Sequence, residues 1–183
     1  MRWDALFAEL EAEFEAADAL VADAELRDRV RRESARLRLY DRLALARGSE
    51  LSVHVVGQTL RGVLSDVGPD WLLLAEGPAR HALVPLTTVS SVTGLGRWSA
   101  VPQSEGKVAA RLDLGYALRG VARDRSAVSL VLVDGSTCAG TIDRVGADFI
   151  EVAEHPAAEA RRAEAVIGVR TVPRTALAIV RSS

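Results

Sequence analysis

The stretch that decides the fold occurs twice, first as Gly62-Val-Leu-Ser-Asp-Val-Gly-Pro-Asp-Trp-Leu-Leu-Leu-Ala-Glu76. It returns as Gly140-Thr-Ile-Asp-Arg-Val-Gly-Ala-Asp-Phe-Ile-Glu-Val-Ala-Glu154, at an offset of 78 residues. Further on, Val84-Pro85 returns as Val172-Pro173 at an offset of 88 residues, so the second copy has ten extra residues between two predicted strands. The repeat predicts one structural unit that is duplicated in tandem.

Each copy is predicted to form five short strands, from the alternation of apolar and polar residues and from the glycines and prolines between apolar runs. In the first copy the strands are expected at 51–55, 60–67, 71–76, 80–85 and 87–92. In the second copy they are expected at 128–133, 137–145, 149–154, 166–172 and 176–181. The repeated turn residues are Gly68, Asp70, Gly146 and Asp148. Aspartate in such a turn is expected to bond its own backbone.

Residues 1–48 are predicted to form a helical arm, because strong helix formers dominate and neither proline nor glycine occurs before Gly48. Apolar residues recur at helical spacing in two stripes, which are put out of phase by the step from Val21 to Leu26. The change of phase favours a helical hairpin with a turn near residues 22–25. The alternative is one unbroken helix that pairs antiparallel with a second copy of the chain.

Charge is divided within this arm. Residues 1–25 contain eight acidic residues and one arginine, whereas residues 26–48 contain eight arginines and three acidic residues. Arginines gathered on a helix are candidates for binding nucleic acid, and here they are Arg27, Arg29, Arg31, Arg32, Arg36 and Arg38. A solvated face paired with the acids of the same arm is the favoured interpretation, because the net charge of the chain is only −2.

Three short motifs resemble those of a known fold group. Gly62-x-Leu64 in the second strand, Gly68-x-Asp70 before the third, and Val84-Pro85-Leu86-x-x-Val89 at the end are similar to the Sm-like (LSm) small β-barrel. The resemblance, shared with other SH3-type barrels, covers residues 40–95 and 112–181 and implies tandem barrels and single-stranded RNA as a ligand. The positions at which that family reads RNA hold other residue types here, namely Trp71-Leu72, Thr87-Thr88, Phe149-Ile150 and Thr175-Ala176.

The sequence thus predicts an α+β protein, in which an N-terminal helical arm precedes two tandem five-stranded SH3/Sm-like barrels, each entered by a helix. The expected domains are the arm at 1–48, the first barrel at 49–95, a linker and helix at 96–126, and the second barrel at 127–183. The second helix is expected at residues 108–123, in the place that residues 40–47 take before the first barrel.

No catalytic, cofactor or metal site is predicted. The single cysteine, Cys138, has the pattern of a strand residue, and the histidines His54, His81 and His155 lack metal-ligand spacing. His155 is expected in a long exposed loop. A cytoplasmic protein is expected, because the first residues are acidic where a signal peptide would be apolar and no apolar run is long enough to span a membrane.

The predicted function is non-catalytic assembly or adaptor work through protein partners or self-association. Two features favour it: the apolar stripes of the arm must be covered, and five-stranded barrels have edges that suit strand addition. The competing hypothesis is nucleic-acid binding, RNA before DNA, which depends on the resemblance and on the arginine run. No cofactor, membrane or small-molecule substrate is expected.

Overall fold

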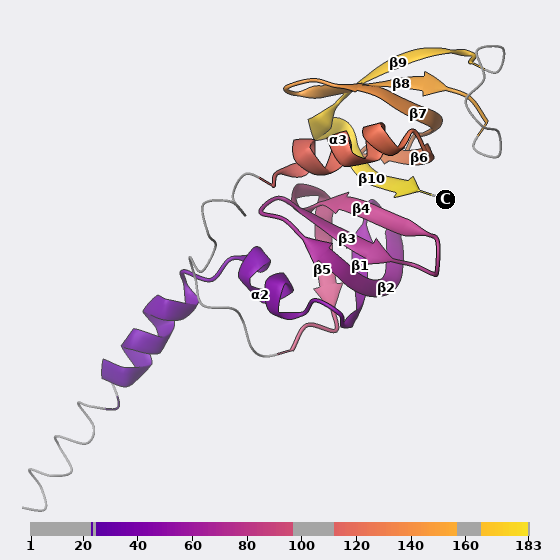
Figure 1. The fold of residues 1–183 in the computed structure, drawn as a ribbon. Coiled ribbons are helices and arrows are strands. Elements are labelled where there is room, and N and C mark those ends of the chain that lie inside the picture. Colours follow the sequence, from indigo (N-terminus) through magenta and orange to yellow (C-terminus); the bar gives the residue numbers. More distant parts are fainter. Residues whose placement is uncertain (1–22, 24, 97–111, 157–165, 183) are drawn as a thin grey trace, which may run out of the picture. The chain divides into compact units, whose positions relative to one another are not determined.

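The computed structural model describes the chain at residues 23, 25–96, 112–156 and 166–182. It divides the chain into two compact units. The first unit, residues 1–38, contains a helix over residues 25–34 whose side chains are exposed. The helical partner expected from residues 1–21 lies outside the described residues, so the hairpin and its alternative stay predictions. The second unit, residues 39–183, contains every described strand (Figure 1).

The strands of the second unit form one antiparallel sheet of ten strands. The first five are β1 (Glu50–Val55), β2 (Gln58–Val67), β3 (Trp71–Ala75), β4 (His81–Pro85) and β5 (Val89–Thr93). The last five are β6 (Ala127–Leu132), β7 (Thr137–Val145), β8 (Phe149–Glu154), β9 (Gly168–Pro173) and β10 (Leu177–Ser182). Their order in the sheet is β5-β1-β2-β3-β4-β10-β6-β7-β8-β9. The prediction of five strands in each copy is confirmed, and no strand end differs from its predicted position by more than two residues.

The two halves of this sheet, β1–β5 and β6–β10, repeat one another in detail. The register between β2 and β3 shifts between Leu64 and Asp66, and the register between β7 and β8 shifts at the equivalent Ile142 and Arg144. Each half also has a short 3-10 helix before its last strand, η1 (Leu86–Thr88) and η4 (Arg174–Ala176). The repeat in the sequence therefore extends to the hydrogen-bonding register of the backbone.

One position in each half requires glycine. Gly62 in β2 and Gly140 in β7 pass so close to the next strand that a Cβ atom would collide with the carbonyl oxygen of Ala75 or Ala153. The obstacle is backbone inside a sheet, so no side-chain rotamer change could relieve the collision. The close strand approach explains why the repeat keeps glycine here.

The predicted fold class, an α+β protein with a helical arm and two separate five-stranded barrels, is wrong, because the two halves share one continuous sheet. β4 of the first half pairs with β10 of the second, with Leu83 opposite Val180 and His81 opposite Ser182 (Figure 1). This pairing occupies the outer row of backbone groups on β4, which a separate barrel would leave free. The described part of the protein is mostly β, with short helices beside the sheet.

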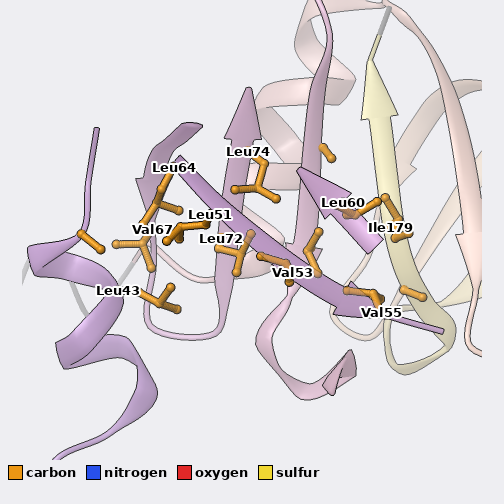
Figure 2. Packing of buried hydrophobic residues seen from close by; sticks show 14 of the residues in the cluster. Leu43, Leu51, Val53, Val55, Leu60, Leu64, Val67, Leu72, Leu74 and Ile179 are labelled. Atoms are coloured by element: carbon orange, nitrogen blue, oxygen red, sulfur yellow. The ribbon is translucent and has the colours of Figure 1, made fainter. Parts of the chain in front are cut away.

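The hydrophobic cores also exchange residues between the halves. The core of the first half includes Ala178 and Ile179 from β10, and Figure 2 shows Ile179 next to Leu60. The core of the second half includes Trp71 and Leu83 from the first half. Burial of one large apolar side chain contributes about 1.5–3 kcal/mol, so these exchanged residues help to hold the halves together.

Two helices pack on the sheet, one before each half. Helix α2 (Leu39–Leu45) buries Leu43 in the first core, and helix α3 (Leu114–Asp124) buries Leu118 in the second. Residues 39–45 thus belong to the second unit. The first four residues of the helix predicted at 108–123 lie outside the described residues.

Candidate functional site

The contact between the two halves begins at the turn from β2 to β3. The backbone N–H of Leu114, the first residue of α3, donates a hydrogen bond to Asp70 Oδ1 at 2.8 Å. The indole N–H of Trp71 donates to the carbonyl oxygen of Leu112, also at 2.8 Å. These two bonds attach the first half to the start of the helix that leads into the second half.

The Asp70 carboxyl is held in surroundings that disfavour its charge. Burial raises the pKa of Asp70 above its ordinary value of 3.8, and repulsion from the Asp113 carboxylate adds to the increase. The hydrogen bond from the Leu114 N–H and the charge of Arg174 lower the pKa, but they do not cancel the effect of burial. The contact with α3 therefore requires partial desolvation of an acidic group.

The contact of β4 with β10, together with Asp70 and Trp71, forms the internal seam. Within it, Arg181 Nε lies 3.1 Å from Glu76 Oε2, and the Glu76 side chain is only 13% exposed. Residues Ala82–Pro85 of β4 are all buried. The seam therefore combines backbone pairing, a largely buried ion pair and apolar packing.

The turn from β7 to β8 reproduces the turn from β2 to β3. The N–H of Gly68 donates to the carbonyl oxygen of Trp71 at 2.9 Å, and the N–H of Gly146 donates to that of Phe149 at 2.8 Å. A Cβ atom on either glycine would meet the aromatic ring of its own turn. The close approach of ring and backbone explains why both turns contain glycine.

The two turn aspartates have equivalent backbones but different side-chain surroundings. The N–H of Leu86 donates to the Asp70 carbonyl at 2.8 Å, and the N–H of Arg174 donates to the Asp148 carbonyl at 2.7 Å. The Asp148 carboxylate is exposed and makes no hydrogen bond or ion pair with any residue that the structure describes. Phe149 is half-buried, whereas its equivalent Trp71 is 6% exposed.

Strand β9, with Asp148 and Phe149, forms the exposed counterpart of the seam surface on β4. Only Val172 in β9 is buried, and Val169 is 65% exposed. Ile167, immediately before the strand, is 81% exposed. At the other end of the sheet order, β5 has no described strand on one side and exposes Ser90, Ser91 and Thr93. Among the described residues, each end of the sheet thus presents a strand that is paired on one side only.

A pocket of about 210 Å³ lies where the turns of the two halves meet. It is lined by Asp70, Pro85, Thr87, Leu114, Asp148, Arg174 and Thr175. Arg174 also lies 3.7 Å from the Asp113 carboxylate. Within the described ranges, no group of three or more His, Cys, Asp or Glu residues is placed to hold a metal ion. The pocket has equivalent residues from both halves on its walls, and its lining is more apolar than polar.

The candidate arginines of the first unit lie beside acids of the same segment. Three form ion pairs at helical spacing: Arg27 with Asp23, Arg29 with Glu33, and Arg31 with Asp28. Arg32 Nε donates to the Asp28 carbonyl oxygen at 3.2 Å. Arg36 and Arg38 follow the end of the helix, so the structure does not place all six on one helical face. Exposed pairs of this kind contribute about 0–1 kcal/mol each.

The histidines lie in different surroundings. His155 was expected in an exposed loop but is buried. Its Nε2 lies 2.8 Å from Thr141 Oγ1, and its Nδ1 lies 3.0 Å from the Pro156 carbonyl oxygen. His54 Nδ1 lies 3.2 Å from Thr59 Oγ1. Burial raises the pKa of the Cys138 thiol, which disfavours the nucleophilic thiolate.

Sequence reasoning missed the residues that make the seam. Trp71 and Leu83 have the pattern of ordinary strand residues, and nothing in the first copy alone distinguishes them. The available signal was a difference between the copies, because Leu83 corresponds to Thr171 and Trp71 to Phe149. A large apolar residue in one copy and a polar or smaller one in the other indicates that the two environments differ.

No helix in the described part of the chain is long and apolar enough to cross a membrane. No family model matches this chain, and neither a curated protein nor a solved structure does so. The resemblance to Sm-like barrels therefore stays a prediction.

Proposed function

We propose that this protein is a non-catalytic assembly protein, which binds protein partners through the free edges of its sheet. The observation that carries this proposal is the exposed counterpart of the seam surface. The first half uses its turn and β4 to bind the second half, whereas the same elements of the second half face solvent. Unpaired strands with exposed apolar side chains favour protein binding by strand addition.

The helix of the first unit offers a further contact surface. Leu26 and Val30 are 59% and 52% exposed, and their spacing of four residues places them on one face. An exposed apolar stripe on a helix is favourable when another protein surface covers it. We include this stripe in the proposed function as a secondary site.

Nucleic-acid binding is the weaker candidate. The arginines on which it depends lie beside carboxylates, which offset their charge and compete with phosphate for the guanidinium groups. The turn and loop positions at which Sm-like proteins read RNA also hold other residue types in this chain.

The assembly function can be tested by photo-crosslinking in the cells from which the protein comes. A photoreactive residue is placed at Thr93 on β5 or at Thr171 on β9, with Arg61 on β2 as an exposed control site away from both free edges. We expect specific protein adducts from the two edge sites and none above background from the control. Edge sites that give no more adducts than Arg61 would contradict the proposed function.

A further inference from the structure

We propose that the pocket between the turns of the two halves binds a free α-amino acid, with the carboxylate of the ligand beside Arg174 and its ammonium group beside Asp148. This inference goes beyond the proposed assembly function, because it concerns a small ligand rather than a protein partner. Such a site was not expected from the sequence, since its residues come together only where the two halves meet.

The pocket has the size and the lining for a small molecule with an apolar body. Its volume of about 210 Å³ lies below the ~300–1,000 Å³ typical of sites for drug-sized ligands, so only a smaller molecule fits. Pro85 and Leu114 supply apolar surface, and the equivalent residues Thr87 and Thr175 carry hydroxyl groups. The charged residues on its walls have both signs, and they decide which class of ligand is favoured.

The positively charged end of the pocket is formed by Arg174. Its Nη1 atom lies 3.7 Å from the Asp113 carboxylate, which is too long for a hydrogen bond, so this contact leaves the guanidinium donors for a ligand. Glycine lies beneath this guanidinium group on α3, because a Cβ atom on Gly115 would collide with Arg174 Nη1 and lie 3.3 Å from Arg119 Nη1. Two guanidinium groups therefore approach the first turn of α3, and such groups bind carboxylates well.

The negatively charged end is formed by the two turn aspartates. The Asp148 carboxylate is exposed and makes no hydrogen bond or ion pair with any described residue, so it can accept hydrogen bonds from an ammonium group. The hydrogen bond from the Leu114 N–H holds Asp70 beside the same pocket. Burial disfavours the charge of Asp70 and raises its pKa, and a cation bound nearby would offset this cost.

The arrangement of these charges favours a zwitterion over a simple ion. An anion alone would be repelled by the two aspartates, and a cation alone by Arg174, whereas a ligand with both charges satisfies both ends. The two ends also start close together, since the N–H of Arg174 donates to the Asp148 carbonyl oxygen at 2.7 Å. An α-amino acid carries its carboxylate and ammonium groups on one carbon atom, and its side chain provides the apolar body.

The first test screens the twenty standard amino acids, each at ~10 mM, against the ¹⁵N-labelled full chain by NMR. We expect at least one to bind with a Kd below ~5 mM and to shift the amide signals of Leu114, Gly115 and Thr175. The best ligand is then compared with the amine that lacks its carboxylate and the acid that lacks its ammonium group. Each analogue should bind at least ~10-fold more weakly, because it leaves one charged end of the pocket without a partner.

Three outcomes of this screen would overturn the proposal. The first is that no amino acid of the panel binds with a Kd below ~5 mM. The second is that the signals that shift belong only to residues away from the pocket. The third is that the amine or the acid binds as tightly as the amino acid, because the charged end that it lacks would then contribute nothing.

Variants assign the two ends of the bound ligand. Asp148→Asn and Arg174→Gln should each weaken binding of the best amino acid at least ~10-fold, and Arg119→Gln at least ~3-fold. Glu50→Gln on β1 and Arg61→Gln on β2 remove the same charges from exposed positions outside the pocket, and should change the Kd less than ~2-fold.

Thermal unfolding checks that each variant is folded. Asp148 has no partner among the described residues, so its variant is expected to fold, and Arg119→Gln replaces Arg174→Gln if the latter does not. Loss of affinity in Asp148→Asn and in a folded arginine variant, with the controls unchanged, is the expected result. Unchanged affinity in Asp148→Asn, or in every folded arginine variant, would overturn the proposal.

Discussion

The strands β4 and β9 have the same place in their halves of the sheet but opposite surroundings. β4 lies between two strands and is buried over Ala82–Pro85, whereas β9 has one neighbour among the described strands and buries only Val172. The residue types follow this difference, since Leu83 on β4 corresponds to Thr171 on β9. The comparison shows that the repeated unit determines the backbone, while its neighbours determine which side chains it carries.

The same difference separates β10 from β5. Residues Leu177–Val180 are buried at the centre of the sheet, whereas Ser90, Ser91 and Thr93 of β5 are exposed. Polar residues on an edge strand reduce unwanted pairing with other chains. The edge strands of the sheet can thus pair with another strand. Their polar side chains limit how strongly they do so.

A large loss of stability is expected where the halves are most alike. Gly62→Ala and Gly140→Ala should each lower the free energy of unfolding by about 2–4 kcal/mol, because the new Cβ atom collides with a backbone carbonyl of the next strand. Urea denaturation followed by circular dichroism measures the loss. Gly77→Ala is the control, since a Cβ atom at that position has nothing within 4 Å. Tolerance of alanine at either Gly62 or Gly140 would show that the two halves are not equivalent.

The next prediction separates the seam from its exposed counterpart. Trp71→Ala should cost about 3–5 kcal/mol, because it removes a buried indole and its hydrogen bond to Leu112. Phe149→Ala should cost about 1 kcal/mol in the monomer, since half-burial leaves less area to lose. Unfolding must be compared at a protein concentration low enough to avoid self-association. Equal losses for the two variants would contradict the distinction between seam and exposed counterpart.

The duplicated strand pattern was predictable from sequence because it is local. Alternation at Leu51 to Val55 and glycine at 62 and 140 follow from sheet geometry inside one copy. The pairing of β4 with β10 was not predictable in the same way, since it joins residues about 100 positions apart and any two of four free edges could have met. The prediction of two separate barrels was wrong because it treated each copy as a unit whose strands pair only with one another.

In the candidate site, too, the local features were predictable from sequence and the long-range contacts were not. Gly68 and Asp70 stand out in the sequence because they recur, but recurrence alone indicates only a common turn. That Asp70 binds the N–H of Leu114 depends on where α3 begins, 44 positions later in the chain. The absence of such a partner for Asp148 among the described residues could not be read from the repeat at all.

A smaller effect is expected from the turn aspartates. Asp70→Ala should cost about 1 kcal/mol, because it leaves the Leu114 N–H without its acceptor, whereas Asp148→Ala should leave monomer stability within about 0.5 kcal/mol. Thermal unfolding at low concentration measures both. A destabilising effect of Asp148→Ala as large as that of Asp70→Ala would show that Asp148 has a partner in the single chain.

The pH dependence of stability provides a further test of the Asp70 contact. Its pKa is raised in the folded protein, so the native state binds more protons than the unfolded state between pH 3.8 and the raised value. The contribution of Asp70 to stability therefore falls as pH rises through this window. Asp70→Asn keeps an acceptor for the Leu114 N–H and does not titrate, so its stability relative to wild type should rise over the same window. No change in that difference with pH would contradict the assigned cause.

The smallest effect is expected in the first unit, which has no counterpart in either half of the sheet among the described residues. Arg31→Glu with Arg32→Glu should leave stability unchanged within about 0.5 kcal/mol, because both side chains lie on an exposed helix. Single-stranded RNA should bind the wild type no more tightly than ~1 µM at ~150 mM salt, since nearby carboxylates offset the arginine charge. Fluorescence anisotropy at two salt concentrations measures this affinity. Tighter binding that weakens with salt and is lost in the double variant would make nucleic acid, rather than a protein, the favoured partner.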